Sequence, residues 1–214
     1  MWNCRVHQYF RPLPPGVVDS WLHGLAHRRP DRQAAFVSRH VSLGAARLRI
    51  LDLKGGDQPL QTPDGLCTIV FNGEIYNHLA LCEELESRDR SFRTRCDTEV
   101  VLHADCEWGN DCFRRLRGMF AAAIWSELDE RLVLVRDRMG IKPLYYRLQD
   151  GEVFFGSEMK CILAHPEVPR RIDLTVLNYF LSLNYVPGPF TRIEGITMLM
   201  PGYLLEWRQW QTAI

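Results

Sequence analysis

The pattern of apolar and polar positions predicts strands from residue 36 onward. Apolar and polar residues alternate with a period of two over 41–44 and 47–51, the spacing of half-buried strands. A short apolar run at 67–71 predicts a further strand, and 203–207 predicts the last one. Between them, the stretch 54–65 is rich in Gly, Pro, Asp and Gln, which indicates a surface loop.

Two hairpins are expected where strand-like segments flank a polar turn. The first pairs 121–125 with 131–135 around a turn at 126–130. The second pairs 144–148 with 153–155 around a turn that contains Asp150-Gly151, and Asp-Gly is a strong hairpin signal.

Apolar residues at helical spacing predict helices between these strands. The predicted helices cover 17–26, 77–87, 98–107, 157–164 and 173–183. In the second of them, Leu79, Cys82 and Leu85 with Glu86 follow the helical period. Asp97 precedes the third helix, where its side chain is expected to serve as the N-cap.

Strands and helices interleaved in this way predict an α+β fold in one domain. Paired antiparallel strands with helices between them are compatible with a four-layer αββα sandwich, in which helices cover two packed sheets. Pattern alone leads no further than α+β.

Composition narrows the class of protein. The chain has 214 residues, 46% of them apolar, which is enough for a sizeable core. Its 26 basic and 26 acidic residues cancel, so charge gives no reason to expect nucleic acid or an anionic membrane as partner. No apolar run approaches the roughly 20 residues of a membrane helix. Seven scattered cysteines without C-x-x-C pairs indicate reduced thiols, a cytoplasmic location and no metal site.

The chemistry-bearing residues cluster in two short motifs. Asn72-Gly73-Glu74 follows the strand that is expected to end at Phe71, and Asn-Gly predicts a turn there. Cys96-Asp97 comes one predicted helix later. An amide side chain, a backbone N–H and carboxylates are the groups that stabilise an oxyanion and hold an amino acid by its charged ends.

These motifs resemble the glutaminase domain of class II glutamine amidotransferases, most closely that of glutamine-hydrolysing asparagine synthetases. Supporting stretches are Ala46-Arg47-Leu48-Arg49-Ile50-Leu51-Asp52, residues 136–146 and residues 156–160. The resemblance implies a four-layer sandwich of the N-terminal nucleophile hydrolase type, extending over about residues 3–208.

The resemblance also implies a role for each site residue. Cys4 would be the nucleophile, with its own α-amine as base. The side chain of Asn72 and the N–H of Gly73 would form the oxyanion hole. The substrate-binding residues would be Arg47 for the α-carboxylate, Glu74 and Asp97 for the α-ammonium, and Leu48, Ile50 and Leu51 for the pocket wall.

The chain departs from the family pattern around the nucleophile. Cys4 follows Met1-Trp2-Asn3, so its nitrogen is an amide unless the chain is cleaved after Asn3 or has a different true start. Arg5 and Arg29 each replace a family glycine. Activity is therefore expected only where Cys4 becomes the first residue.

The sequence contains no Ser-Gly-Gly-x-Asp-Ser phosphate loop. Residues 1–208 are expected to form the amidotransferase domain, and 209–214 a stub where a synthetase domain would begin. No cofactor is expected in this chain, because ATP and magnesium would belong to the synthetase domain. The expected partners are L-glutamine and a separate synthetase subunit or a second copy of the chain. Two alternatives remain open, a catalytically dead remnant that binds glutamine or regulates a synthetase, and a truncated fragment.

Overall fold

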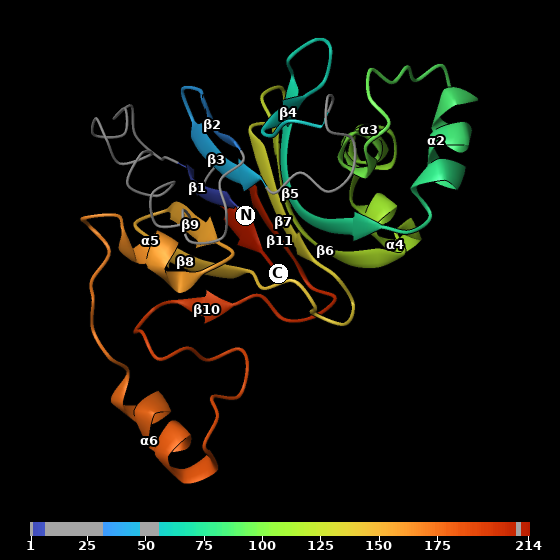
Figure 1. Cartoon of the computed structure of the whole chain (residues 1–214). Helices are drawn as coiled ribbons and strands as arrows, with labels where there is room; N and C mark the ends of the chain where they lie inside the picture. The colour runs from blue at the N-terminus through green and yellow to red at the C-terminus, as the bar shows by residue number, and fades with distance from the viewer. Residues whose placement is uncertain (1, 7–31, 48–55, 209–210) are drawn as a thin grey trace.

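The computed structural model describes residues 2–6, 32–47, 56–208 and 211–214. Its described strands form two antiparallel six-stranded sheets, which lie against each other in the centre of the molecule (Figure 1). The first sheet has the order β10-β8-β9-β1-β3-β2 and the second has the order β12-β11-β7-β6-β5-β4. The sheets bring together strands that lie far apart in the sequence, which local patterns do not predict.

The strands of the first sheet are β1 (Trp2–Val6), β2 (Arg32–Val37), β3 (Val41–Arg47), β8 (Tyr145–Gln149), β9 (Glu152–Gly156) and β10 (Thr197–Met198). Those of the second are β4 (Leu60–Gln61), β5 (Cys67–Ile75), β6 (Gly118–Ser126), β7 (Arg131–Arg136), β11 (Leu204–Arg208) and β12 (Gln211–Ala213). The described helices are α2 (His78–Glu86), α3 (Asp97–Trp108), the 3₁₀ turn η2 (Gly109–Asp111), α4 (Cys112–Arg115), α5 (Met159–Leu163) and α6 (Leu174–Leu183).

The apolar residues of β6 show how the layers are built. Ala121, Ala123 and Trp125 pack in the core between the two sheets. Ala122 and Ile124, on the other face, pack against α2, α3 and α4. A strand buried on both faces reads as a continuous apolar run, which is why β6 lacks alternation.

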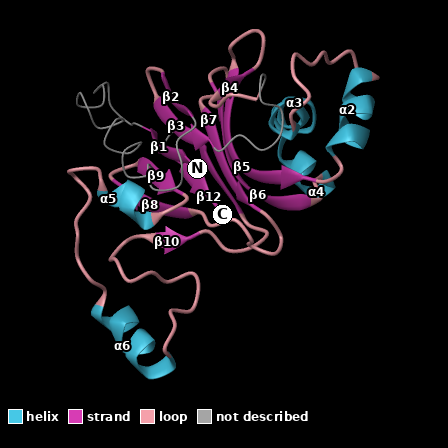
Figure 2. Ribbon diagram, viewed as in Figure 1, coloured by secondary structure: helices cyan, strands magenta, loops and turns pink. Residues whose placement is uncertain are grey.

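On the outer face of the first sheet, Phe154 of β9 packs with Ile162 of α5. Helices therefore cover both outer faces, and Figure 2 shows the strands between them. The expected four-layer αββα sandwich is confirmed. The helix predicted over 17–26 lies outside the described residues.

Both predicted hairpins are confirmed. β6 pairs with β7, and β8 pairs with β9. The turn between β8 and β9 places Asp150 at φ 51° and Gly151 at φ 79°, the left-handed region that the Asp-Gly pair favours.

Three local expectations need correction or stay untested. In α2 the buried residues are Leu81 and Leu85, whereas Leu79 is 69% exposed, so the predicted apolar stripe is wrong at Leu79. The strand expected from residue 47 is instead the end of β3, and 48–51 lie outside the described residues. β12 extends the second sheet inside the expected stub, and the boundary at residue 208 stays a prediction.

Candidate active site

The predicted oxyanion-hole residues lie inside a strand, not in a turn. β5 continues to Ile75, and Asn72 and Gly73 pair there with Ala121 and Phe120 of β6. The expectation that the strand ends at Phe71 is therefore wrong.

The physical reason lies in the close approach of the two strands. A Cβ on Gly73, whose φ is 155°, would lie 2.1 Å from the carbonyl oxygen of Met119. A Cβ on Gly118 would lie 2.1 Å from the carbonyl oxygen of Glu74. Glycine is needed at both positions for the backbones to meet, so the Asn-Gly pair reflects crowding between strands and not a turn.

Asp97 joins the start of α3 to the end of β5. Its Oδ2 accepts a hydrogen bond from the backbone N–H of Ile75 at 2.9 Å. The predicted N-cap role is wrong, because α3 begins at Asp97 itself and Cys96 takes the cap position. The bond to Ile75 places the carboxylate of Asp97 beside the segment that carries Glu74.

The surroundings of Asp97 favour a bound cation. Burial raises the pKa of this carboxyl most, and the neighbouring Glu74 raises it further, whereas the N–H groups of Ile75 and Thr98 and the side chain of His78 lower it. Two partly buried carboxylates at one place repel each other unless a positive group lies between them. An ammonium group is such a partner.

Cys4 and Arg47 belong to the other sheet. The backbone of Cys4 in β1 lies opposite Leu43 of β3 and Phe155 of β9, and Arg47 is the last residue of β3. Both β1 and β3 contact β5 across the core. The structure thus brings the strand of the predicted nucleophile next to the strand of the predicted oxyanion hole. The predicted wall residues Leu48, Ile50 and Leu51 lie outside the described residues.

Two supporting residues were missed by the sequence analysis. Gln58 accepts a hydrogen bond from the Phe71 N–H at 2.7 Å and donates to Thr98 Oγ1 at 3.5 Å, so it ties β5 to α3. Asp137 is 1% exposed and accepts from the N–H of Phe120, the residue opposite Gly73. A glutamine in a predicted loop gives no signal, whereas an aspartate directly after a strand is a turn-forming pattern that could have been noticed.

In the part of the chain that the structure describes, no three His, Cys, Asp or Glu side chains are grouped to hold a metal ion. None of the described helices has both the length and the apolar character that crossing a membrane requires.

Comparison with known proteins decides the family. A family model described as "Glutamine amidotransferase domain" matches residues 4–214. The chain belongs to the glutamine amidotransferase family. The resemblance seen in the sequence motifs is confirmed.

Curated relatives of this amidotransferase domain are asparagine synthetases. The chain is 39% identical over 205 residues to asparagine synthetase [glutamine-hydrolyzing] 3 of Bacillus subtilis. This match covers 91% of the chain and 33% of the Bacillus protein. It is 42% identical over 139 residues to asparagine synthetase [glutamine-hydrolyzing] 3 of Arabidopsis thaliana, covering 64% of the chain and 24% of that protein. The chain thus spans about a third or less of the length of these relatives. The likeness does not favour the alternative of a binding or regulatory remnant.

A solved structure supports the same fold. The glutamine phosphoribosylpyrophosphate amidotransferase of B. subtilis superposes with a TM-score of 0.67 at 18% identity, over 100% of this chain and 48% of that one. At this identity the likeness concerns the fold alone. The fold is a four-layer α+β sandwich of the N-terminal nucleophile type, as the resemblance implied.

Proposed function

We propose that this amidotransferase domain hydrolyses the side-chain amide of L-glutamine to glutamate and ammonia. The Cys4 sulfur attacks the amide carbon while the α-amine of Cys4 accepts the thiol proton. The C–N bond then breaks, ammonia leaves with that proton, and a cysteinyl thioester remains. Water hydrolyses the thioester to glutamate and the free thiol. The amine acts as base only in a chain whose first residue is Cys4.

In this proposal, β5 and α3 hold the substrate. The side chain of Asn72 and the N–H of Gly73 donate to the oxyanion of the tetrahedral intermediates. Glu74 and Asp97 accept hydrogen bonds from the α-ammonium, and Arg47 pairs with the α-carboxylate. Leu48, Ile50 and Leu51 would line the pocket wall.

The observation that carries the proposal is the bond between Asp97 and the Ile75 N–H. It holds a carboxylate from α3 next to Glu74 on β5, two residues from Asn72. The strand of Cys4 contacts the same β5. This arrangement supplies one place for the charged end of an amino acid and one for an oxyanion.

We further propose that the ammonia passes to an acceptor such as activated aspartate, held by a synthetase body that is part of a longer chain or a separate subunit. The relatives are named glutamine-hydrolysing asparagine synthetases, which supports this acceptor. ATP and magnesium would act in that synthetase body. The apolar face of α6 supports docking, since Leu174 and Leu181 are each 74% exposed on a helix set away from the sheets (Figure 1).

The test combines intact mass, N-terminal sequencing and a glutamine-like electrophile, 6-diazo-5-oxo-norleucine, on the purified protein. We expect a mass that lacks Met1 to Asn3, one adduct on Cys4, and release of ammonia from glutamine. An intact Met1 together with an unlabelled Cys4 and no ammonia would overturn the proposal.

A further inference from the structure

A cavity lies at the opposite end of β5 from the proposed active site. Its volume is about 440 Å³, and its lining includes Cys67, His103, Asp105 and Cys106. Cys67 is six residues before Gly73 on the same strand, which corresponds to roughly 20 Å. The cavity is therefore a separate feature from the glutamine site.

Two thiols from different elements meet in this cavity. Cys67 begins β5 and Cys106 lies in the last turn of α3, and both are half-buried. Both residues line the cavity, and the neighbouring Cys106 thiol lowers the pKa of Cys67 although burial opposes this. The same contact raises the pKa of Cys106.

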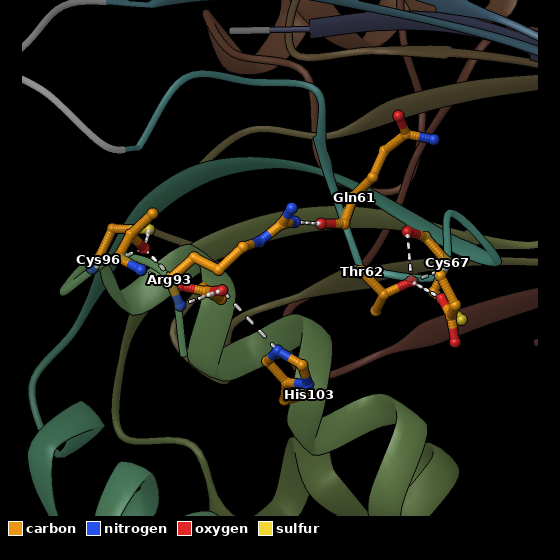
Figure 3. A network of polar contacts seen from close by, with 9 residues as sticks. Gln61, Thr62, Cys67, Arg93, Cys96 and His103 are labelled. Carbon is orange, nitrogen blue, oxygen red and sulfur yellow. Dashed lines mark hydrogen bonds and ion pairs between the residues drawn. The ribbon is translucent and has the colours of Figure 1, made fainter. Parts of the chain in front are cut away.

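Thr62 fixes the backbone of Cys67 at this spot. The Thr62 Oγ1 accepts from the Cys67 N–H at 3.0 Å and donates to Asp64 at 2.6 Å. Figure 3 shows Thr62 and Cys67 side by side, with His103 projecting from α3. Exposed side chains on the rim, Leu128 among them, bring the cavity to the molecular surface.

The cavity is also lined by buried polar atoms that make no hydrogen bond within the described residues. His103 is 4% exposed, and neither of its ring nitrogens has a hydrogen-bond partner among the described residues. Its Nε2 lies 3.9 Å from Glu99 Oε1, and burial lowers the pKa of His103 although Glu99 opposes this. Asp105 uses one oxygen for Arg131, while its Oδ1 has no such partner. Such groups favour the entry of small polar molecules.

The other described cysteines with a shifted pKa differ from Cys67. Burial raises the pKa of Cys82, Cys96 and Cys112. None of these three lines the cavity. Reactivity of a thiol follows its thiolate fraction as well as its access to reagents, and the lowered pKa favours Cys67 over these three thiols.

We propose that Cys67 and Cys106 form a reversible dithiol–disulfide pair that hydroperoxides oxidise. The Cys67 thiolate attacks the terminal oxygen of the peroxide, the O–O bond breaks, and an alcohol or water leaves after protonation. The resulting Cys67 sulfenic acid is attacked by the Cys106 sulfur. The S–O bond breaks, and hydroxide leaves as water with the Cys106 proton. The two thiols lose two electrons, which the peroxide gains.

The disulfide would join the start of β5 to the end of α3. The other ends of these elements carry Glu74 and Asp97, which meet through the Ile75 N–H. Oxidation is therefore expected to shift the KM for glutamine, a consequence that rests on the proposed function. Formation of the bond itself does not rest on it.

The test treats the reduced full chain with one equivalent of hydrogen peroxide, blocks free thiols, and maps peptides by mass spectrometry. We expect a cross-linked peptide that joins Cys67 to Cys106, has lost two hydrogens, and is restored by dithiothreitol. Sulfinic acid at Cys67 without a cross-link, or two alkylated thiols, would overturn the proposal. A cross-link in a chain without glutaminase activity would leave this proposal standing and count against the proposed function alone.

A second measurement compares alkylation rates near neutral pH in chains with matched thermal unfolding. We expect Cys67 to react at least about tenfold faster than Cys82. The Cys106→Ser variant should lose the cross-link, whereas Cys82→Ser should form it as the parent does. Equal rates at Cys67 and Cys82 would contradict the assignment of Cys67 as the attacking thiol.

Discussion

Gly73 lies where a single atom decides whether two strands can pair. A Cβ there would lie 2.1 Å from the Met119 carbonyl oxygen, and φ is 155°, which L-residues rarely adopt. The same residue supplies the N–H proposed for the oxyanion hole. Its structural and catalytic requirements therefore coincide at one position.

Substitution of Gly73 should be costly for stability. We expect Gly73→Ala to lower the free energy of unfolding by roughly 2–4 kcal/mol, because the strands must separate. The matched control is Gly65→Ala, which also has positive φ, at 74°, but open space around the added methyl, and should cost about 1 kcal/mol. Urea unfolding of both variants checks the difference, and equal losses would show that crowding is not the cause.

Asp97, the proposed ligand of the substrate's ammonium group, is also expected to make stability depend on pH. Its pKa is raised above 3.8, chiefly by burial, so the folded state holds a proton that the unfolded state releases. The stabilising contribution is thus present below pH 3.8 and is lost as pH rises through the folded pKa. We expect Asp97→Asn to gain stability relative to the parent as pH rises from 3.8 to neutrality, measured by thermal unfolding across pH.

The Asp97→Asn variant keeps an oxygen for the Ile75 N–H but loses the charge. We therefore expect kcat/KM for glutamine to fall about 10- to 100-fold, from the loss of a charge-assisted bond. The control for the stability measurement is Asp64→Asn. Hydrogen bonds from Thr62 and Leu66 lower the pKa of Asp64, so this variant should lose stability relative to the parent as pH rises. An unchanged kcat/KM would rule out Asp97 as an ammonium ligand.

At the scale of elements, Asp137 fastens a turn to β6. Its Oδ1 accepts from the N–H groups of Met139 and Ile141 at 3.0 and 3.1 Å. Its Oδ2 accepts from those of Phe120 and Lys142 at 3.2 and 3.1 Å. Since Phe120 pairs with Gly73, this carboxylate supports the strand that carries the proposed oxyanion hole.

An amide at residue 137 has one acceptor oxygen, so two of the four N–H groups would lose their partner. We expect Asp137→Asn to cost about 2–4 kcal/mol of unfolding free energy. Asp150→Asn removes a charge at an exposed turn with φ 51°, which asparagine tolerates, and should change stability by less than about 0.5 kcal/mol. Denaturant titration of both variants measures their free energies of unfolding. Similar losses would contradict the role of Asp137 in holding the turn against β6.

At the scale of the whole molecule, α6 differs from the rest of the sandwich. Val176 is its one buried residue, whereas Leu181 is 74% exposed. A helix that leaves most of its apolar surface uncovered contributes little to the core. Such a surface is suited to contact with another body.

We expect Leu181→Glu to weaken binding to the synthetase body at least about tenfold, since a charge would be buried at the contact. The melting temperature of the chain should not change. Leu79→Glu on α2 is the matched control, being 69% exposed on the other side of the molecule (Figure 1), and should bind as the parent does. Titration calorimetry with the synthetase body measures this change in affinity. Sedimentation shows whether a second copy of the chain binds the apolar face of α6 instead.

Local signals predicted much of the fold. Asp150-Gly151 alone specifies a hairpin, because only residues that tolerate positive φ fit its turn. The apolar runs of β6 and β7 predicted strands correctly, since burial on both faces demands them. The motif around Asn72-Gly73-Glu74 pointed to the correct family, because its combination of residue types is specific to that family.

Long-range contacts decided what local signals could not. The Asn72-Gly73 pair is typical of a turn in sequence but lies in a strand. The glycine is needed there because a backbone carbonyl oxygen of β6 lies too close for any side chain. Asp97 reads as an N-cap, but its oxygen bonds to Ile75, 22 residues away. By itself the sequence determined the α+β class, both hairpins and the family. Which strands are neighbours, and where Asp97 meets β5 and Cys67 meets Cys106, depended on the packing of distant segments, which only the tertiary structure decides.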